Sequence, residues 1–391
     1  MECWHDLSQQ NKLPNPDVPY CDRIPQFSNG RPRVRALMRN QEIWDLMANK
    51  AVDIIVNCVP APRLEKYPDM SGRKRSMYVC LDANMEWQCY LKDEPQLRCL
   101  DMIGSKTPFW TQKTFELMRA LPNVLHSSEV EQQLSSRTEH IGWPEIDQMV
   151  HMDRVEIRKR YGLPQDKPVV VCLNWVDMSS ISLDLAWFQC ESLRQKIHAA
   201  WRYRTDWRRY AKIWGSVSIT DVTDVIRSFC DNNGAWLVMK NRYRDPLALA
   251  EQRVADQVIC DASYYPHTMV ELMKAADFCI SYMSFGVREA AACRIPSVVL
   301  DVAGLSAWPS FGEIGESIYL KFLEEGSFFN FPGVVSALSG DTIESKLSTA
   351  ALGDFCGTSM DFDAYFDKFI GQRGVSHTAA FLDAIVARWS V

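Results

Sequence analysis

The sequence has little of what several classes of protein need. Its 391 residues contain 43 lysines and arginines against 49 aspartates and glutamates, a net charge of -6, whereas nucleic-acid-binding domains normally carry a basic excess. No stretch approaches the roughly 18 to 20 apolar residues of a membrane-spanning helix. The first residues, Met1 to Asp6, have neither the basic nor the apolar region of a signal peptide. We therefore expect a cytoplasmic protein with no nucleic-acid partner.

The cysteines are not arranged for disulfide or zinc chemistry. None of the 13 cysteines forms a CxxC pair, and no cysteine and histidine cluster has zinc spacing. Several lie in apolar runs that predict buried strands, where cysteine packs as a small hydrophobic residue: Cys58, Cys80, Cys172, Cys260 and Cys279. The sequence also lacks a GxSxG turn, an HExxH motif and a GxxxxGK[ST] phosphate loop. These absences argue against a disulfide framework and against the common hydrolase and NTPase signatures.

Strand-like and helix-like segments alternate in the first half of the chain. The apolar run at 52–59 is typical of a parallel strand covered on both faces. A helix is expected at 107–120, with Thr107 as N-cap and Pro108 in its first turn. The other expected elements are a helix at 41–49 and strands at 33–38, 76–81 and 97–103. This alternation predicts a Rossmann-like domain.

The second half repeats the alternation. Strands are expected at 168–173, 236–240, 257–260, 278–281 and 297–301, and helices at 220–232, 247–253, 268–276 and 287–293. The passage 139–168, which contains glycine, three prolines and a charged helix, separates the halves. Since a single core rarely grows to this length, we predict an α/β protein with two Rossmann-like domains that face a central cleft. Their expected bounds are 1–150 and 151–341, followed by a helical C-terminal tail at 342–391.

The strongest candidate site is the stretch 276–291, ADFCISYMSFGVREAA. It predicts a buried strand, a short loop with Ser284, Phe285 and Gly286, and then a helix. The N–H groups and positive dipole at a helix start suit a phosphate, and the Ser284 hydroxyl could add a hydrogen bond. Glu289 could accept hydrogen bonds from ribose hydroxyls. Alternatively, because Gly286 and Glu289 have N-cap to N3 spacing, Glu289 only caps the helix.

Further donor-binding candidates follow the expected strands of the second half. Lys240 and Arg242 follow a strand and could neutralise a donor phosphate; alternatively, they belong to a basic surface loop. Tyr264 could stack on a base and His267 could touch a phosphate, although a capped helix after a proline turn is the better explanation for His267 taken singly. Asn174 follows the first strand of this half.

Tryptophans and basic residues alternate within 187–214. This composition suits peripheral contact with the inner face of a membrane that bears a lipid-linked acceptor, and it equally suits a solvated helix whose tryptophans pack on the core. Asp361 and Asp363 form a DxD pattern, which can hold a metal on a nucleotide sugar. Because that pattern lies in the helical tail, we interpret it as a solvated face and expect no metal and no cofactor.

Two motifs resemble a known group of enzymes. Residues 141–147, IGWPEID, resemble the GxPxxD passage of GT-B-type transferases of bacterial surface polymers, and 161–171, YGLPQDKPVVV, resembles the opening of their donor domain. LVMK at 237–240 and the run 271–301 are similar to the donor half of CDP-glycerol glycerophosphotransferases and surface-polysaccharide glycosyltransferases. The resemblance implies that Ser284, Phe285 and Gly286 hold the donor phosphates, with Glu289 as a ribose or donor contact. The loop of that group reads Asp-Tyr-Ser-Ser, whereas this chain has Ser-Tyr-Met-Ser at 281–284.

Together these features predict a metal-independent glycosyltransferase that moves a sugar from a nucleotide-sugar donor to a surface-glycan or lipid-linked acceptor. Asp82, Glu86 and Asp101, near expected strand ends, are its candidate catalytic acids or bases. The alternatives are a CDP-alditol phosphotransferase, a nucleotide-sugar 2-epimerase, and a non-catalytic nucleotide-binding subunit of a glycan-assembly complex. The altered serine loop motivates the last.

Overall fold

The computed structural model describes residues 2–6, 33–37, 53–57, 76–82, 91–121, 124–173, 219–240, 249–259, 268–282, 284–301 and 321–389. The chain forms two compact units. The first unit contains Met1–Val150 and Phe366–Val391, and the second contains His151–Ala262 and Pro266–Tyr365. In the described part of the chain, no helix is both long and apolar enough to cross a membrane.

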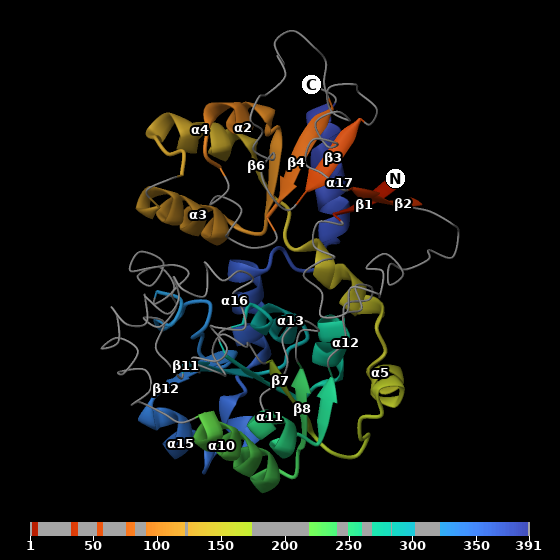
Figure 1. Cartoon of the computed structure of the whole chain (residues 1–391), viewed down its shortest axis with the longest axis vertical. Helices are drawn as coiled ribbons and strands as arrows, with labels where there is room; N and C mark the ends of the chain where they lie inside the picture. Colours follow the sequence, from red (N-terminus) through yellow and green to blue (C-terminus); the bar gives the residue numbers. More distant parts are fainter. Residues whose placement is uncertain are drawn as a thin grey trace, which may run out of the picture. The chain divides into compact units, whose positions relative to one another are not determined.

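The first unit is built on a four-stranded parallel sheet (Figure 1). Its strands lie in chain order: β3 (Ile54–Asn57), β4 (Met77–Leu81), β5 (Met102–Ser105) and β6 (Thr138–His140). In the same unit, β1 (Glu2–Asp6) and β2 (Arg33–Leu37) form a separate parallel pair. The predicted strands at 33–38, 52–59 and 76–81 are therefore confirmed, with shorter bounds.

Helices cover both faces of this sheet, as Figure 1 shows: α2 (Glu94–Cys99), α3 (Pro108–Ala120) and α4 (Ser128–Arg137) on one face, and α17 (His377–Trp389) on the other. The alternation of side chains along β4 explains both layers. Tyr78 and Cys80 belong to the core with α2, α3 and α4, whereas Met77 and Val79 pack with Phe381 of α17. Residues more than 290 positions later in the chain thus complete this core.

The predicted strand at 97–103 is wrong at its beginning. Residues up to Cys99 belong to α2, and β5 starts only at Met102. The reason is local: Asp93 is the N-cap, its carboxylate accepts from the Gln96 N–H at 3.0 Å, and a proline stands in the first turn. The apolar residues Leu97, Cys99 and Leu100 fit either a helix or a strand, so their pattern could not decide between the two.

The second unit contains six parallel strands in the spatial order β12-β11-β10-β7-β8-β9. Their bounds are β7 (Val169–Leu173), β8 (Trp236–Lys240), β9 (Gln257–Ile259), β10 (Phe278–Ser281), β11 (Ser297–Asp301) and β12 (Val335–Ser339). Numbered within the unit, the order is 6-5-4-1-2-3, which is that of a doubly wound Rossmann sheet. The α/β fold class predicted from the sequence is confirmed.

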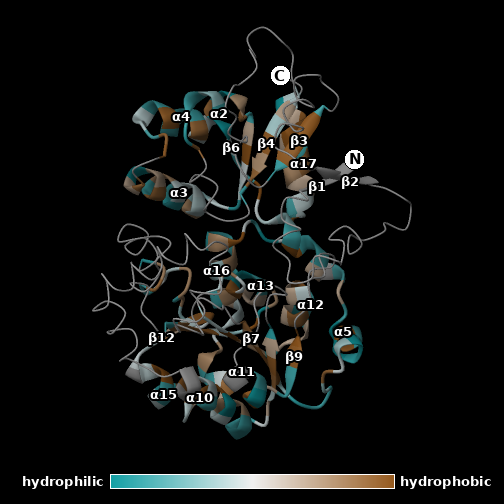
Figure 2. Cartoon of the chain, viewed as in Figure 1, coloured by the Kyte–Doolittle hydropathy of each residue, from teal (hydrophilic) through white to brown (hydrophobic). Residues whose placement is uncertain are grey.

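Side chains alternate between two cores along these strands. Val169, Val171 and Leu173 pack with α5 (Arg154–Tyr161) and α12 (Thr268–Ala275), whereas Phe278 contacts Phe229 of α10 (Ile219–Asn232) at 5.4 Å between ring centroids. Figure 2 shows the consequence, with strands coloured apolar and the outer helix α5 hydrophilic. The cysteines predicted to pack in strands are buried where described, at Cys80, Cys172 and Cys279; Cys58 and Cys260 lie outside the described residues.

The residues after β12 are mainly helical: α15 (Asp341–Leu347), the 3-10 helix η6 (Leu352–Phe355), α16 (Ser359–Phe369) and α17. They do not form the separate tail that we predict from the sequence. Residues up to Tyr365 belong to the second unit, and those from Phe366 onward belong to the first. The physical reason is packing, because Phe381 and Ile385 fill one face of the first sheet.

Candidate functional site

The strand order of the second sheet reverses between β7 and β10, which are direct neighbours. Leu173 at the end of β7 is in register with Ser281 of β10 on one side and with Lys240 of β8 on the other. In doubly wound sheets, ligands bind outside the carboxyl ends of the strands at such a reversal. The loop predicted as the phosphate site directly follows β10, so it begins at this position.

The loop is closed by its own hydrogen bonds. The Ser284 N–H donates to Ser281 Oγ at 2.9 Å, and the Gly286 N–H donates to Ser284 Oγ at 3.2 Å. The next two N–H groups, of Val287 and Arg288, donate to the carbonyls of Ser284 and Phe285 at 3.4 and 3.0 Å. This corrects the prediction that the helix start offers unbonded N–H groups to a phosphate, because nearby loop oxygens already accept from them. Helix α13 (Val287–Ala292) is also only six residues long.

Gly286 is required by close packing. A Cβ atom built on Gly286 would lie 2.3 Å from Leu173 Cδ1 and 3.0 Å from Met269 Sδ. Its φ of -58° is accessible to any residue, so the backbone conformation alone does not demand glycine. The helix start therefore packs on the end of β7 and on α12.

Phe285 anchors the loop from the other side. Its ring lies 5.4 Å from that of Phe328 and 5.8 Å from that of Phe329, and both partner rings are fully buried. The Arg288 guanidinium lies 5.6 Å from the Phe285 ring centroid, in cation–π range. The Phe285 side chain thus packs within the unit.

Glu289 belongs to a buried polar group inside the second unit. Glu289 is 2% exposed, Arg288 is 6% exposed, and Tyr365 of α16 is fully buried. Burial raises the pKa of Tyr365 well above its usual value, while Arg288 lowers that pKa and Glu289 raises it. The Tyr365 hydroxyl donates to the Phe328 carbonyl at 3.0 Å. The fold thus keeps the Glu289 carboxylate away from bulk water. Its predicted contact with a ribose stays a prediction.

Lys240 is a buried lysine at the carboxyl edge of the second sheet. It is the last residue of β8, only 8% of it is exposed, and its register partner is Leu173. The surface-loop alternative is therefore wrong for Lys240. Five other predicted residues and the membrane-contact stretch 187–214 lie outside the described residues: Glu86, Asn174, Arg242, Tyr264 and His267.

The first unit carries a buried ion pair at the carboxyl edge of its own sheet. Asp82 directly follows β4, and Lys106 directly follows β5. Lys106 Nζ donates to the Asp82 carbonyl at 2.6 Å and lies 3.8 Å from Asp82 Oδ2. Each residue is 2% exposed, and Lys106 Nζ also lies 5.5 Å from the Trp110 ring centroid. Sequence reasoning missed Lys106, although a lysine at the carboxyl end of a strand was the signal that singled out Lys240.

A second polar group lies at the same edge. The Thr111 hydroxyl of α3 donates to Ser105 Oγ at 3.1 Å and lies 3.1 Å from His140 Nε2. Ser105 ends β5 and His140 ends β6, and the two are register partners. The sequence analysis missed His140 because β6 has only three residues and no apolar pattern, and it missed Ser105 because the strand predicted at 97–103 ended before that residue.

Asp101 does not join this site. It precedes β5, its carboxylate accepts from the Tyr78 N–H at 2.7 Å, and its own N–H donates to the Tyr78 carbonyl at 2.9 Å. Asp101 therefore links the amino-terminal ends of β4 and β5, opposite the edge where Asp82 lies. The structure brings Asp82 together with Lys106 and leaves Asp101 out.

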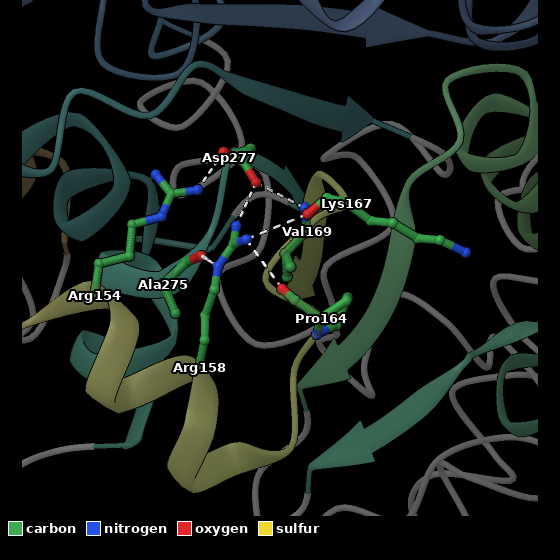
Figure 3. Close-up of polar contacts among 7 residues, drawn as sticks. All are labelled: Arg154, Arg158, Pro164, Lys167, Val169, Ala275 and Asp277. Carbon is green, nitrogen blue, oxygen red and sulfur yellow. Dashed lines mark hydrogen bonds and ion pairs between the residues drawn. The ribbon is translucent and has the colours of Figure 1, made fainter.

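Another charged cluster, drawn in Figure 3, lies at the amino-terminal edge of the second sheet. The Asp277 carboxylate accepts from Arg154, from Arg158 at 2.5 Å and from the Val169 N–H at 2.8 Å. Arg158 also donates to the carbonyls of Pro164 and Ala275, at 3.0 and 2.9 Å. Burial raises the pKa of Asp277, whereas the hydrogen bond from the Val169 N–H and the charges of the two arginines lower it. The lowering effects are larger together, so the net shift of the pKa is downward. This cluster holds α5, β7 and β10 together.

The carboxylates of the DxD pattern contact protein groups. Asp361 Oδ2 accepts from the Thr358 N–H at 2.7 Å and from the Thr358 hydroxyl at 2.8 Å. Asp363 pairs with Arg294 at 2.7 Å. Both contacts are those of ordinary surface residues on α16.

Comparison with known proteins supports the fold. No protein-family model and no curated protein matches the sequence. A solved structure of a substituted form of the wall teichoic acid polymerase TagF matches with a TM-score of 0.52 at 15% identity, covering 99% of this chain and 87% of that chain. A TagF structure soaked with CDPG matches with a TM-score of 0.50 at 14% identity, covering 91% and 77%.

A UDP-GlcNAc 2-epimerase from Methanocaldococcus jannaschii gives a TM-score of 0.47 at 9% identity over 99% of both chains. At these identities the TagF likeness concerns the fold, which is GT-B-like. The resemblance to GT-B-type enzymes that we stated from the sequence is therefore confirmed for the fold.

Proposed function

We propose that the chain is a glycosyltransferase that transfers a sugar from a nucleotide-activated donor held by the second unit to a glycan acceptor held by the first. The observation that carries the proposal is the reversal of strand order between β7 and β10, with buried Lys240 on the adjacent strand. A doubly wound sheet binds nucleotides at such a reversal. The phosphates of the donor need a cation there, and Lys240 supplies one.

Lys240 has a larger role in this proposal than the helix dipole. The N–H groups of Gly286, Val287 and Arg288 already donate within the loop. The departing nucleotide phosphate therefore has to be stabilised mainly by positive side chains. We propose Lys240 as one such positive side chain, with Arg242 and His267 as further contacts and with Asn174 and Tyr264 beside the nucleoside.

Burial makes Lys240 a strong phosphate ligand. A charge that is shielded from water interacts more strongly with an opposite charge, because less of the field is screened. The buried side chain is also already ordered, so a phosphate that binds it does not need to immobilise a long, mobile lysine. Ser284, whose hydroxyl already accepts from the Gly286 N–H, retains its own proton for a phosphate oxygen.

The comparisons support a nucleotide-linked donor but do not select the group transferred. TagF shares the fold, and one of its structures was soaked with CDPG. A sugar transferase, an alditol phosphotransferase, a 2-epimerase and a non-catalytic binding subunit would all bind a nucleotide-linked donor at this edge. We favour transfer to an acceptor over epimerisation or binding alone because the first unit presents polar side chains at its own carboxyl edge, where an acceptor can bind.

Donor binding is tested by thermal unfolding with UDP-, GDP-, CDP- and CMP-linked donors. A donor at 100 times its dissociation constant should stabilise the protein by about 2.7 kcal/mol. Lys240→Met keeps the apolar part of the side chain and removes its charge, so this variant should fold and lose that stabilisation. Lys167→Met is the matched control, because Lys167 is exposed at the opposite edge of the same sheet. No stabilisation by any donor would refute the proposed site.

Turnover separates the alternatives. The stabilising donor is incubated alone and then with lipid-linked and soluble glycan acceptors, and the nucleotide and sugar products are measured. Sugar transfer that requires an acceptor supports the proposal. Conversion of the donor alone identifies an epimerase, transfer of an alditol phosphate identifies a phosphotransferase, and binding without any product identifies a non-catalytic subunit.

A further inference from the structure

His140 lies at the acceptor edge of the first unit. It ends β6 and is the register partner of Ser105, which ends β5. Since parallel strands end at one edge of a sheet, His140, Ser105 and the Asp82–Lys106 pair occupy the same edge. Ile103, two positions before Ser105, packs in the core with α2, α3 and α4. Ser105 and His140 therefore face α3, and Thr111 of that helix contacts both.

Thr111 links Ser105 to the ring of His140. Its hydroxyl oxygen lies 3.1 Å from Ser105 Oγ and 3.1 Å from His140 Nε2. A hydroxyl donates one hydrogen bond and can accept others, so when the Thr111 proton goes to Ser105, the Thr111 oxygen accepts from Nε2–H. In that tautomer, Nδ1 carries the lone pair that can take up a proton. Ser105 is buried and His140 is exposed. The hydrogen bonds through Thr111 therefore connect the exposed imidazole ring to a buried serine.

The surroundings keep the ring neutral. The protein covers part of the His140 ring, and this partial desolvation lowers the pKa of His140, while the charge of Glu139 opposes the shift only in part. Glu139 is itself paired with Arg388 of α17 at 2.7 Å, the ring contacts the uncharged Thr111 hydroxyl of α3, and the register partner of His140 on β5 is the uncharged Ser105. A neutral imidazole at neutral pH can accept a proton.

Two other histidines, His377 and His126, have different surroundings. His377 is 1% exposed, and both of its ring nitrogens are engaged: Nδ1 accepts from the Trp143 N–H at 3.1 Å, and Nε2 lies 2.8 Å from the Gln372 carbonyl. His126 is exposed, and its Nε2 lies 3.7 Å from Glu131. His140 combines exposure with a hydroxyl that orients its ring.

We propose that His140 is the general base of the transfer, with Thr111 as its positioning residue. This inference rests on the proposed function. The acceptor hydroxyl gives its proton to His140 Nδ1 while its oxygen forms a bond to the reacting sugar carbon. The bond between that carbon and the donor phosphate oxygen breaks, and its electron pair leaves with the nucleotide. His140 then releases the proton to solvent.

The central test is His140→Gln in the full-length protein. The glutamine amide can still donate to Thr111 but cannot accept a proton as a base. We expect kcat to fall by about 10²- to 10⁴-fold, while the thermal stabilisation by donor stays at the wild-type value. The decline of wild-type kcat/KM toward acid pH should be absent from the residual activity of the variant. Imidazole added to His140→Ala should restore part of the rate, which a purely structural role would not allow.

Thr111 gives an independent readout. Thr111→Val removes the hydroxyl that orients the ring and should lower kcat about 10-fold, whereas Thr111→Ser should retain activity. His126→Gln is the matched control and should be unaffected.

Two failures can be distinguished. Wild-type turnover together with an unchanged kcat and pH profile in His140→Gln would overturn the base assignment and leave the transferase proposal standing. A wild-type protein that neither binds nor converts any donor would overturn the proposed function, and the base assignment with it.

Discussion

Gly286 lies directly against Leu173: a Cβ atom on the glycine would be 2.3 Å from the leucine Cδ1. The contact joins the loop after β10 to the end of β7, which are the two strands where the sheet order reverses. The position of the loop is thus set by packing against the strand beside it. This contact gives the first prediction.

Gly286→Ala should destabilise the protein by about 1 to 3 kcal/mol, because the added methyl group overpacks the contact with Leu173. Urea unfolding measures the change. Gly353→Ala is the control, since a Cβ there meets nothing within 4 Å, and it should stay within about 0.5 kcal/mol of wild type. Equal effects of the two substitutions would show that the close approach is absent in solution.

Gly142 combines a left-handed backbone with a close contact. Its φ is +74°, and a Cβ would lie 2.5 Å from His377 Cδ2, whereas Gly374 has a φ of +75° with nothing within 4 Å. Both alanine variants should lose about 1 to 2 kcal/mol from backbone strain. Gly142→Ala should lose about 1 to 3 kcal/mol more, because it also displaces the His377 ring. Thermal or urea unfolding of the two variants measures how much more stability Gly142→Ala loses than Gly374→Ala, and this difference reports the packing of His377 of α17 against Gly142. Similar losses in both variants would contradict that packing.

Asp277 should contribute to stability in a pH-dependent way. Asp277→Asn leaves the buried Arg158 without a charged partner and should cost about 3 kcal/mol at pH 7. Because the pKa of Asp277 is lowered in the folded protein, its contribution is present above the unfolded pKa of about 4 and is lost as the pH falls through the folded value. The difference between wild type and variant, measured by urea unfolding at several pH values, should therefore shrink below about pH 4.

The control for this prediction is Asp367→Asn. Asp367 pairs with Arg373 at 2.9 Å, but the two side chains are 49% and 47% exposed. An exposed pair of this kind contributes less than about 1 kcal/mol. A cost for Asp277→Asn that is equally small, or independent of pH, would contradict the role assigned to the cluster.

Much of the fold could be predicted because its signals are local. The strands 236–240, 278–281 and 297–301 have the predicted bounds, since each is an apolar run flanked by turn residues. Thr107 is the N-cap of α3, as predicted, although its hydroxyl donates to the Lys368 carbonyl at 2.8 Å rather than to the helix. Strand β6 was missed because its three residues pair with β5 and carry no periodic pattern of their own.

The features of the candidate site also fall into those that local sequence predicts and those that depend on tertiary contacts. The sequence alone determined that a serine and glycine loop follows a buried strand and that a lysine ends another, because both features depend on neighbours in the chain. Only the tertiary structure decided that the loop bonds to itself, that Lys240 is buried, and that Lys106 joins Asp82 while Asp101 lies at the opposite edge. The placement of His140 beside Thr111 and Ser105 was decided in the same way, since pairing between strands and packing of a helix on a sheet bring together residues that are distant in sequence.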